Sequence, residues 1–160
     1  MDEAQALPPN KALLSGTRPW AFSTAELTAG LRKHTGDPSL SISALADGEI
    51  PNQRPGVGRL RGLRIAAQGK SGEHDFRLVL KEPQGRTRAG TAGVGLREVS
   101  VYTDMAEHIP LRIPQLFAAH PKGHWLIIQQ LEPGKPAEEW AADEYLLAVD
   151  LLADLHDRFW

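Results

Sequence analysis

The residues best suited to chemistry in this sequence are a lysine at the end of one predicted strand and a glutamate on the helix after it. Residues 76–81 alternate as a β-strand does, with Phe76, Leu78 and Leu80 on one face and Arg77, Val79 and Lys81 on the other. Glu98 shares a predicted helix face with Val101, Tyr102 and Met105. A carboxylate on a largely apolar face is costly unless it is paired. We therefore predict an ion pair between Lys81 and Glu98.

Both residues also have an ordinary explanation. A lysine at the end of an edge strand is commonly exposed to solvent, where its charge prevents aggregation through the strand edge. Glu98 could likewise face solvent and pair with Arg97 or Ser100. A strand lysine joined to a helix glutamate is, however, the arrangement with which kinases hold the phosphates of ATP. Because Val79 is small and apolar and Glu98 has apolar neighbours, we favour the functional interpretation.

Four stretches resemble the N-terminal lobe of the aminoglycoside phosphotransferase and choline kinase-like family. They are residues 77–81 (RLVLK), 97–102 (REVSVY), 125–132 (WLIIQQLE) and 151–160 (LLADLHDRFW). The resemblance covers about residues 40–160 and implies a protein kinase-like fold. The catalytic loop of His-Gly-Asp type and the metal-binding aspartate are absent, because the sequence stops at Trp160. We therefore expect a catalytically incomplete lobe with no catalytic or metal-binding residue of its own, whose missing part is C-terminal because Met1 is an initiating residue.

The resemblance also implies a set of nucleotide-binding residues. Lys81, oriented by Glu98, would hold the phosphates. Val79 would cover one face of the adenine, and Ile128 would lie at the back of its pocket. The hinge, residues 129–131, would offer backbone groups to the adenine. Gly56 and Gly58, with Arg59, would approach phosphate oxygens, although an ordinary glycine-containing hairpin explains them equally well. The implied set is Lys81, Glu98, Val79, Ile128, Gln129, Gln130, Leu131, Gly56, Gly58 and Arg59. We expect ATP to bind weakly or not at all to this chain, and magnesium to bind only in a complete enzyme.

The hydrophobic pattern predicts an α+β fold that could hold these residues. Ser23 and Glu26 have the spacing of a capping box for a helix that runs to about His34. Strands are predicted over 39–46, 59–68, 76–81, 113–119 and 124–131, with the central helix before the last two. We expect a five-stranded, mainly antiparallel sheet with a central helix, an N-terminal helix and a long C-terminal helix. The divisions are an arm over 1–22, the lobe over 23–136 and a following segment over 137–160.

Composition excludes several other classes. The net charge of −2 gives no reason to expect nucleic acid or an anionic membrane as a partner. The chain has no cysteine, which excludes disulfides and thiolate metal sites and fits the cytoplasm. His120 and His124 flank a predicted turn, so they lack the helical pairing that suits zinc. No apolar run approaches the roughly 18 residues of a membrane span.

The predicted helix over 143–160 carries more apolar surface than one packed face requires. Asp143, Asp150, Asp154 and Asp157 form one polar stripe, and large apolar residues occupy most of the remainder. We expect the sheet to cover one side of this helix. A second copy of the chain, in a symmetric dimer, or a missing C-terminal lobe would cover the other. The alternative to a nucleotide-binding lobe is a protein-interaction module without catalysis, which would bind a protein through the sheet of the lobe or through its bare underside.

Overall fold

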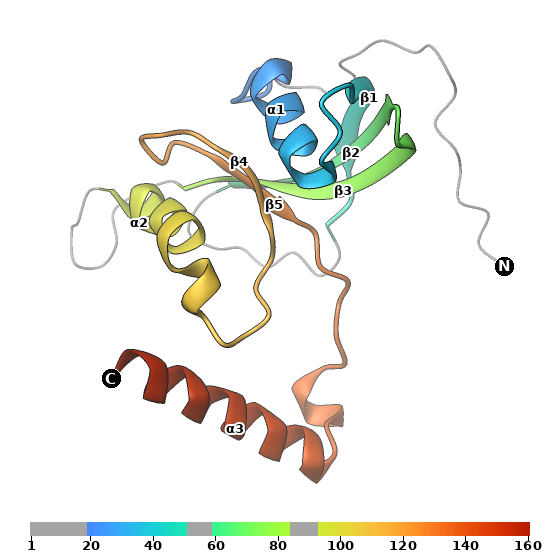
Figure 1. The fold of residues 1–160 in the computed structure, drawn as a ribbon. Helices are drawn as coiled ribbons and strands as arrows, with labels where there is room; N and C mark the ends of the chain where they lie inside the picture. Colours follow the sequence, from blue (N-terminus) through green and yellow to red (C-terminus); the bar gives the residue numbers. More distant parts are fainter. Residues whose placement is uncertain (1–18, 51–58, 84–92) are drawn as a thin grey trace, which may run out of the picture.

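The computed structural model describes residues 19–50, 59–83 and 93–160, and they form the α+β fold that the sequence predicts (Figure 1). One antiparallel sheet carries five strands in the order β1-β2-β3-β5-β4. Its strands are β1 Ser41–Gly48, β2 Arg59–Gly69, β3 Gly72–Glu82, β4 Leu116–Ala119 and β5 Leu126–Gln129. The α-helices are α1 Thr24–Thr35, α2 Val94–Ser100 and α3 Ala142–Phe159, and a short 3-10 turn spans Ala137–Glu139.

Local signals set both ends of α1. The side chain of Ser23 accepts a hydrogen bond from the Glu26 backbone, and the Glu26 carboxylate accepts one from the Ser23 backbone, which completes the predicted capping box. The helix ends at Gly36, whose φ of 69° lies in the left-handed region that glycine adopts without strain. The helix and its ends are therefore specified within one short stretch of sequence.

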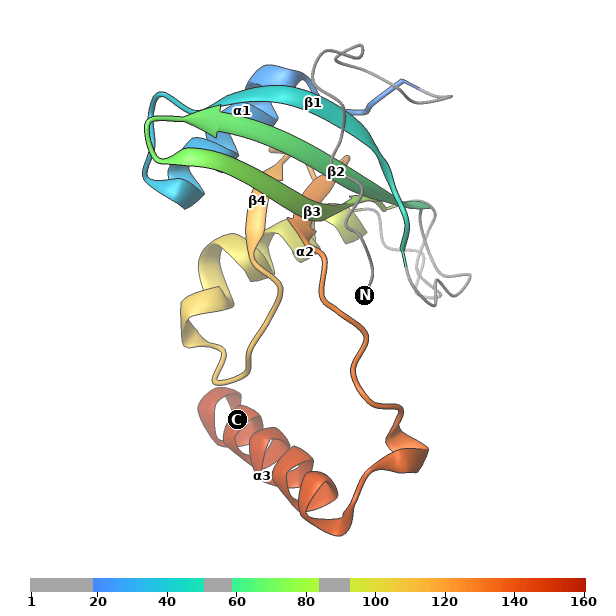
Figure 2. The same cartoon turned by 90° about the vertical axis from the view of Figure 1, so that its right-hand side faces the viewer.

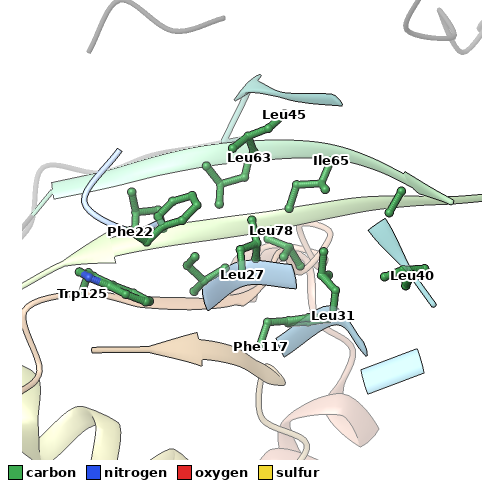
Figure 3. Packing of buried hydrophobic residues seen from close by; sticks show 13 residues of the cluster. Phe22, Leu27, Leu31, Leu40, Leu45, Leu63, Ile65, Leu78, Phe117 and Trp125 are labelled. Carbon is green, nitrogen blue, oxygen red and sulfur yellow. The ribbon is translucent and has the colours of Figure 1, made fainter. Parts of the chain in front are cut away.

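The main core lies between α1 and one face of the sheet (Figure 3). Leu27 and Leu31 of α1 are fully buried together with Leu63 and Ile65 of β2 and Leu80 of β3. Phe22 and Trp20, from the segment before α1, pack on the same cluster, with their ring centroids 5.7 Å apart. These two aromatic residues thus fix the chain just before α1 to the core.

Glycine allows α1 to approach the sheet closely. A Cβ at Gly30 would lie 1.8 Å from the backbone oxygen of Phe117 in β4, well inside contact distance. The helix therefore rests directly on the backbone of β4 at this position. Packing this close leaves no space for a larger residue.

The structure corrects several details of the predicted sheet. Strands β4 and β5 are shorter than expected, since they span only Leu116–Ala119 and Leu126–Gln129. In β2, Leu60 pairs with Lys81 and is half-buried, on the face opposite to the buried Leu63. At β5, Leu126 and Ile127 are fully buried on the two faces of the sheet, whereas Ile128 is half-buried.

The central helix is not a continuous α-helix. After α2 the chain continues as a π-helical turn over Val101–Met105 and a 3-10 turn over Ala106–His108. Figures 1 and 2 show α1 on one side of the sheet and α2 on the other. The helix α2 is therefore free to contact the sheet face that α1 leaves uncovered.

The C-terminal helix α3 lies apart from the sheet (Figure 2). None of its residues is buried, although Ala148 and Leu155 are half-buried. Its C-terminal part lies near residues 107–110, and a hollow lined by Glu107, His108, Asp154 and Arg158 lies between them. The expectation that the sheet covers one side of this helix is therefore wrong, because the segment over 130–141 carries α3 away from the strands. No helix in the described ranges has the length and apolar character needed to span a membrane.

Candidate functional site

The predicted ion pair between β3 and α2 is confirmed. Lys81 Nζ donates a hydrogen bond to Glu98 Oε1 over 2.5 Å. The two side chains are 30% and 22% exposed, so both groups are shielded yet open to solvent on one side. This ion pair thus joins β3 to α2 on the face of the sheet that points away from α1.

Two glycines set the position of α2 that makes this pair possible. A Cβ at Gly95 would lie 1.9 Å from the backbone oxygen of Gly123, in the turn between β4 and β5. A Cβ at Gly123 would lie 2.1 Å from the backbone nitrogen of Leu96, and Gly123 has a φ of 69°. Backbone therefore meets backbone at the first turn of α2. Glu98 follows within one helical turn, so this contact fixes where its carboxylate lies.

The face that α2 turns to the sheet differs from the predicted one. Gly95 and Val99 are buried and Tyr102 is half-buried, whereas Val101 and Met105 are about 37% and 38% exposed. The prediction centred the face on Glu98, but the Gly95–Gly123 contact centres it on Val99 and leaves Glu98 at its margin. Burial, together with the nearby charge of Glu98, raises the pKa of the Tyr102 hydroxyl.

A row of small and apolar residues crosses the sheet beside Lys81. Val79 pairs with Ile128 on one side and with Gly62 on the other, and Gly62 pairs with Gly48. Paired residues in an antiparallel sheet point to the same face, and positions two residues apart along a strand do so as well. Val79, Ile128 and Lys81 therefore share one face, as the resemblance requires of an adenine roof and a phosphate-binding lysine.

The predicted hinge leaves β5 at the edge of this face. The Gln129 N–H donates to the backbone oxygen of Gln115 over 2.8 Å, and the Gln130 N–H donates to that of Arg77 over 3.1 Å. Within the described part of the chain, the Leu131 N–H donates no hydrogen bond, and the side chain is 53% exposed. Leu131 therefore has a free backbone donor, as expected of a residue in a hinge that offers backbone groups.

A hollow of about 430 Å³ lies beside the hinge, on the side of the Val79 row away from Lys81. Its lining consists of Asp47, Gly48, Glu49, Arg64, Arg77, Gln130 and Glu132. Arg64 and Arg77 pair directly across β2 and β3, and the buried Nε of Arg64 has no hydrogen-bond partner among the described residues. Two like charges placed directly opposite each other are unfavourable, and a nearby carboxylate offsets this repulsion. Arg77 Nη1 lies 3.6 Å from Glu132 Oε1.

The remaining predicted residues are not brought to Lys81. Arg59 pairs with Glu82 in the β2–β3 register and lies 3.8 Å from its carboxylate. Strand alternation thus directs it to the face opposite Lys81. Gly56 and Gly58 lie outside the described residues. Sequence reasoning missed the roles of Gly95 and Gly123, because the partner of each close contact lies far away in the sequence.

Comparison with known proteins adds no assignment: no family model matches this chain, and no curated protein or solved structure does.

Proposed function

We propose that this chain is the ATP-binding lobe of a small-molecule phosphotransferase, catalytically incomplete as given. The observation that carries the proposal is the Lys81–Glu98 ion pair, which joins a strand to a helix on a sheet face with small and apolar neighbours. A lysine held by a glutamate is a pre-positioned cation for phosphate oxygens. Phosphoryl transfer depends on positioning and charge neutralisation, so a lysine oriented before the nucleotide arrives serves that chemistry.

The roles of the other residues follow from where they lie. Val79 and Ile128 would cover one face of the adenine, and the free N–H of Leu131 would donate to its edge. Lys81 lies two residues from Val79 along β3, about 7 Å away at the strand rise. That separation suits a nucleotide whose base lies under Val79 and whose phosphates reach the ammonium group.

Binding and turnover of ATP by the 160-residue chain test this proposal. The chain presents the roof and hinge of a site but no base or metal ligands of the family type, so ATP is expected to bind at about millimolar affinity, or roughly 4 kcal/mol. Phosphate transfer and ATP hydrolysis should be absent. Robust magnesium-dependent turnover by the purified chain would show that the chemistry lies elsewhere.

The second candidate is a protein-interaction module, and a separate observation favours it. Eight large apolar residues of α3 or its end are at least 37% exposed: Tyr145, Leu146, Leu147, Val149, Leu151, Leu152, Phe159 and Trp160. An apolar surface of this extent is typical of an interaction site. The two candidates are compatible, because the nucleotide face and α3 involve different residues.

A further inference from the structure

The hollow beside the hinge is lined by two arginines whose hydrogen-bond donors are unused. Arg64 of β2 and Arg77 of β3 are direct cross-strand partners, on the sheet face that also carries Val79. Within the described part of the chain, neither guanidinium donates a hydrogen bond, and the buried Nε of Arg64 has no partner at all. A buried donor without an acceptor is costly. An oxygen-bearing ligand in the hollow would relieve that cost.

The nearby carboxylates do not satisfy these arginines. The nitrogen–oxygen distance is 3.8 Å from Arg64 to Asp75 and 3.6 Å from Arg77 to Glu132, both beyond hydrogen-bonding distance. Both carboxylate side chains are more than half exposed, so water screens each contact. Two positive charges that lie directly opposite each other are therefore poorly compensated. Their mutual repulsion favours an anion between them.

A glycine gives Arg64 its room in the hollow. A Cβ at Gly48 would lie 3.2 Å from Arg64 Cγ, which is tighter than ordinary contact. Gly48 thus lets the stem of Arg64 lie close to the backbone of β1. The hollow measures about 430 Å³, and the side chains of Arg64 and Arg77 are 34% and 56% exposed. A small ion can therefore reach both guanidiniums from solvent.

The other charges of the lining modulate this anion site. Asp47 accepts a hydrogen bond from Arg61 over 2.8 Å, which offsets its charge. The Glu49 carboxylate forms no ion pair with any described residue, so it lowers the affinity of the hollow for anions. All the positive charge among the lining residues belongs to Arg64 and Arg77. A bound anion must therefore contact this pair.

From these observations we propose that Arg64 and Arg77 form a binding site for a doubly charged oxyanion, with a phosphate group as its ligand. A guanidinium presents N–H donors in a rigid plane that suits phosphate oxygens, and two guanidiniums match the charge of a dianion. The Arg64 Nε–H would donate to one of these oxygens. Free phosphate and a phosphate monoester share this chemistry. The site does not depend on nucleotide binding at Lys81, because it lies on the other side of Val79.

Titration of the 160-residue chain with glycerol 3-phosphate and with inorganic phosphate tests the site. Carbon-detected NMR spectra report the side-chain Nε and Cζ signals of Arg64 and Arg77 directly, so phosphate bound elsewhere does not affect the readout. At pH 7 a phosphate monoester is mostly doubly charged. Both signals should shift and saturate, at an ionic strength held constant with chloride. The tighter of the two ligands shows whether the site prefers an ester or the free ion.

Matched variants show which side chains bind the phosphate. Arg64→Gln and Arg77→Gln should each weaken binding about tenfold or more, as the loss of hydrogen bonds to a charged group predicts. Arg112→Gln is the control, because Arg112 is exposed and lies outside the hollow, so its affinity should equal that of the wild type. Glu49→Gln should tighten binding several-fold, since it removes a negative charge from the lining.

Two further comparisons separate phosphate recognition from simple charge attraction. Arg77→Lys keeps the positive charge but loses the planar guanidinium, so it should also weaken binding, and it is the milder variant if Arg77→Gln alters the circular dichroism. Acetate, which carries one charge, should bind several-fold more weakly than glycerol 3-phosphate. The proposal would be overturned by signals of Arg64 and Arg77 that do not saturate, by an equal loss of affinity in Arg112→Gln, or by acetate that binds as tightly as the phosphates.

Discussion

Lys81 and Glu98 join β3 to α2 through one short hydrogen-bonded ion pair, and both side chains remain partly exposed. Water screens a pair of this kind, so its worth to folding is small, about 0–1 kcal/mol. The pair orients the lysine ammonium more than it stabilises the fold. This distinction determines how its variants should behave.

Removing either charge should leave the fold almost as stable as before. Lys81→Ala and Glu98→Gln are each expected to change the free energy of unfolding by no more than about 1 kcal/mol. Urea denaturation measures this directly. A decrease of several kcal/mol in the free energy of unfolding of either variant would show that the ion pair is mainly structural. The pair would then no longer support a functional site at Lys81.

The contact between Gly95 and Gly123 should be much less tolerant. Gly95→Ala would place a Cβ 1.9 Å from the Gly123 oxygen, so α2 must move, at a cost of about 1–3 kcal/mol. The shift should also separate Glu98 from Lys81. Gly134→Ala is the control, because a Cβ there meets nothing within 4 Å, and its stability should change by less than about 0.5 kcal/mol. Equal effects of the two substitutions would contradict the described packing of α2.

The titration of Tyr102 reports the environment of Glu98. Its pKa is raised, first by burial and second by the Glu98 charge, from an ordinary value of about 10. Because the folded-state pKa is the higher one, the stability contribution is present below about pH 10 and is lost as the pH rises through that folded value. In a Tyr145→Phe background, phenolate absorbance reports Tyr102 alone, since the chain has two tyrosines. Adding Glu98→Gln should lower the Tyr102 pKa part of the way. If Glu98→Gln left the Tyr102 pKa unchanged, the Glu98 carboxylate would lie farther from the Tyr102 hydroxyl than the structure shows.

Asp37 should make the fold sensitive to acid. This carboxylate, 6% exposed, accepts hydrogen bonds from the backbone and hydroxyl groups of Ser39 and Ser71, which hold its pKa well below its usual range. A lowered folded-state pKa means that the stability is present above the unfolded value of about 4 and is lost as the pH falls below it. The Asp37→Asn variant should therefore have a lower free energy of unfolding than the wild type at neutral pH. On acidification it should lose less of that free energy than the wild type does. Asp150→Asn, on the exposed side of α3, should behave as the wild type does.

The sequence predicts those parts of the structure that depend on neighbouring residues. The capping box of Ser23 and Glu26 and the left-handed Gly36 mark the ends of α1 within a few residues. The alternation over 76–81 assigns the two faces of β3, and with them the placement of Lys81 and Val79 on one face.

Features that depend on distant contacts could not be predicted in the same way. Nothing near Gly95 in the sequence shows that Gly123 will approach it, so the helix face of α2 was predicted one residue away from its observed centre. Nothing within the helix α3 shows that it leaves the sheet, because the segment before it sets its position. The pairing of Arg64 with Arg77 likewise follows only from the register of β2 and β3.

The central claim is that Lys81 binds the phosphates of a nucleotide, and comparing ATP with adenosine tests it most directly. Affinities from NMR titration should show that Lys81→Ala weakens ATP binding about tenfold or more, since a hydrogen bond to a charged group contributes about 1.5–3 kcal/mol. Adenosine affinity should be unchanged, because Lys81 does not contact the base. Lys70→Ala, in the exposed turn between β2 and β3, should bind both ligands as the wild type does. Equal ATP affinity in the wild type and Lys81→Ala would contradict the proposed site.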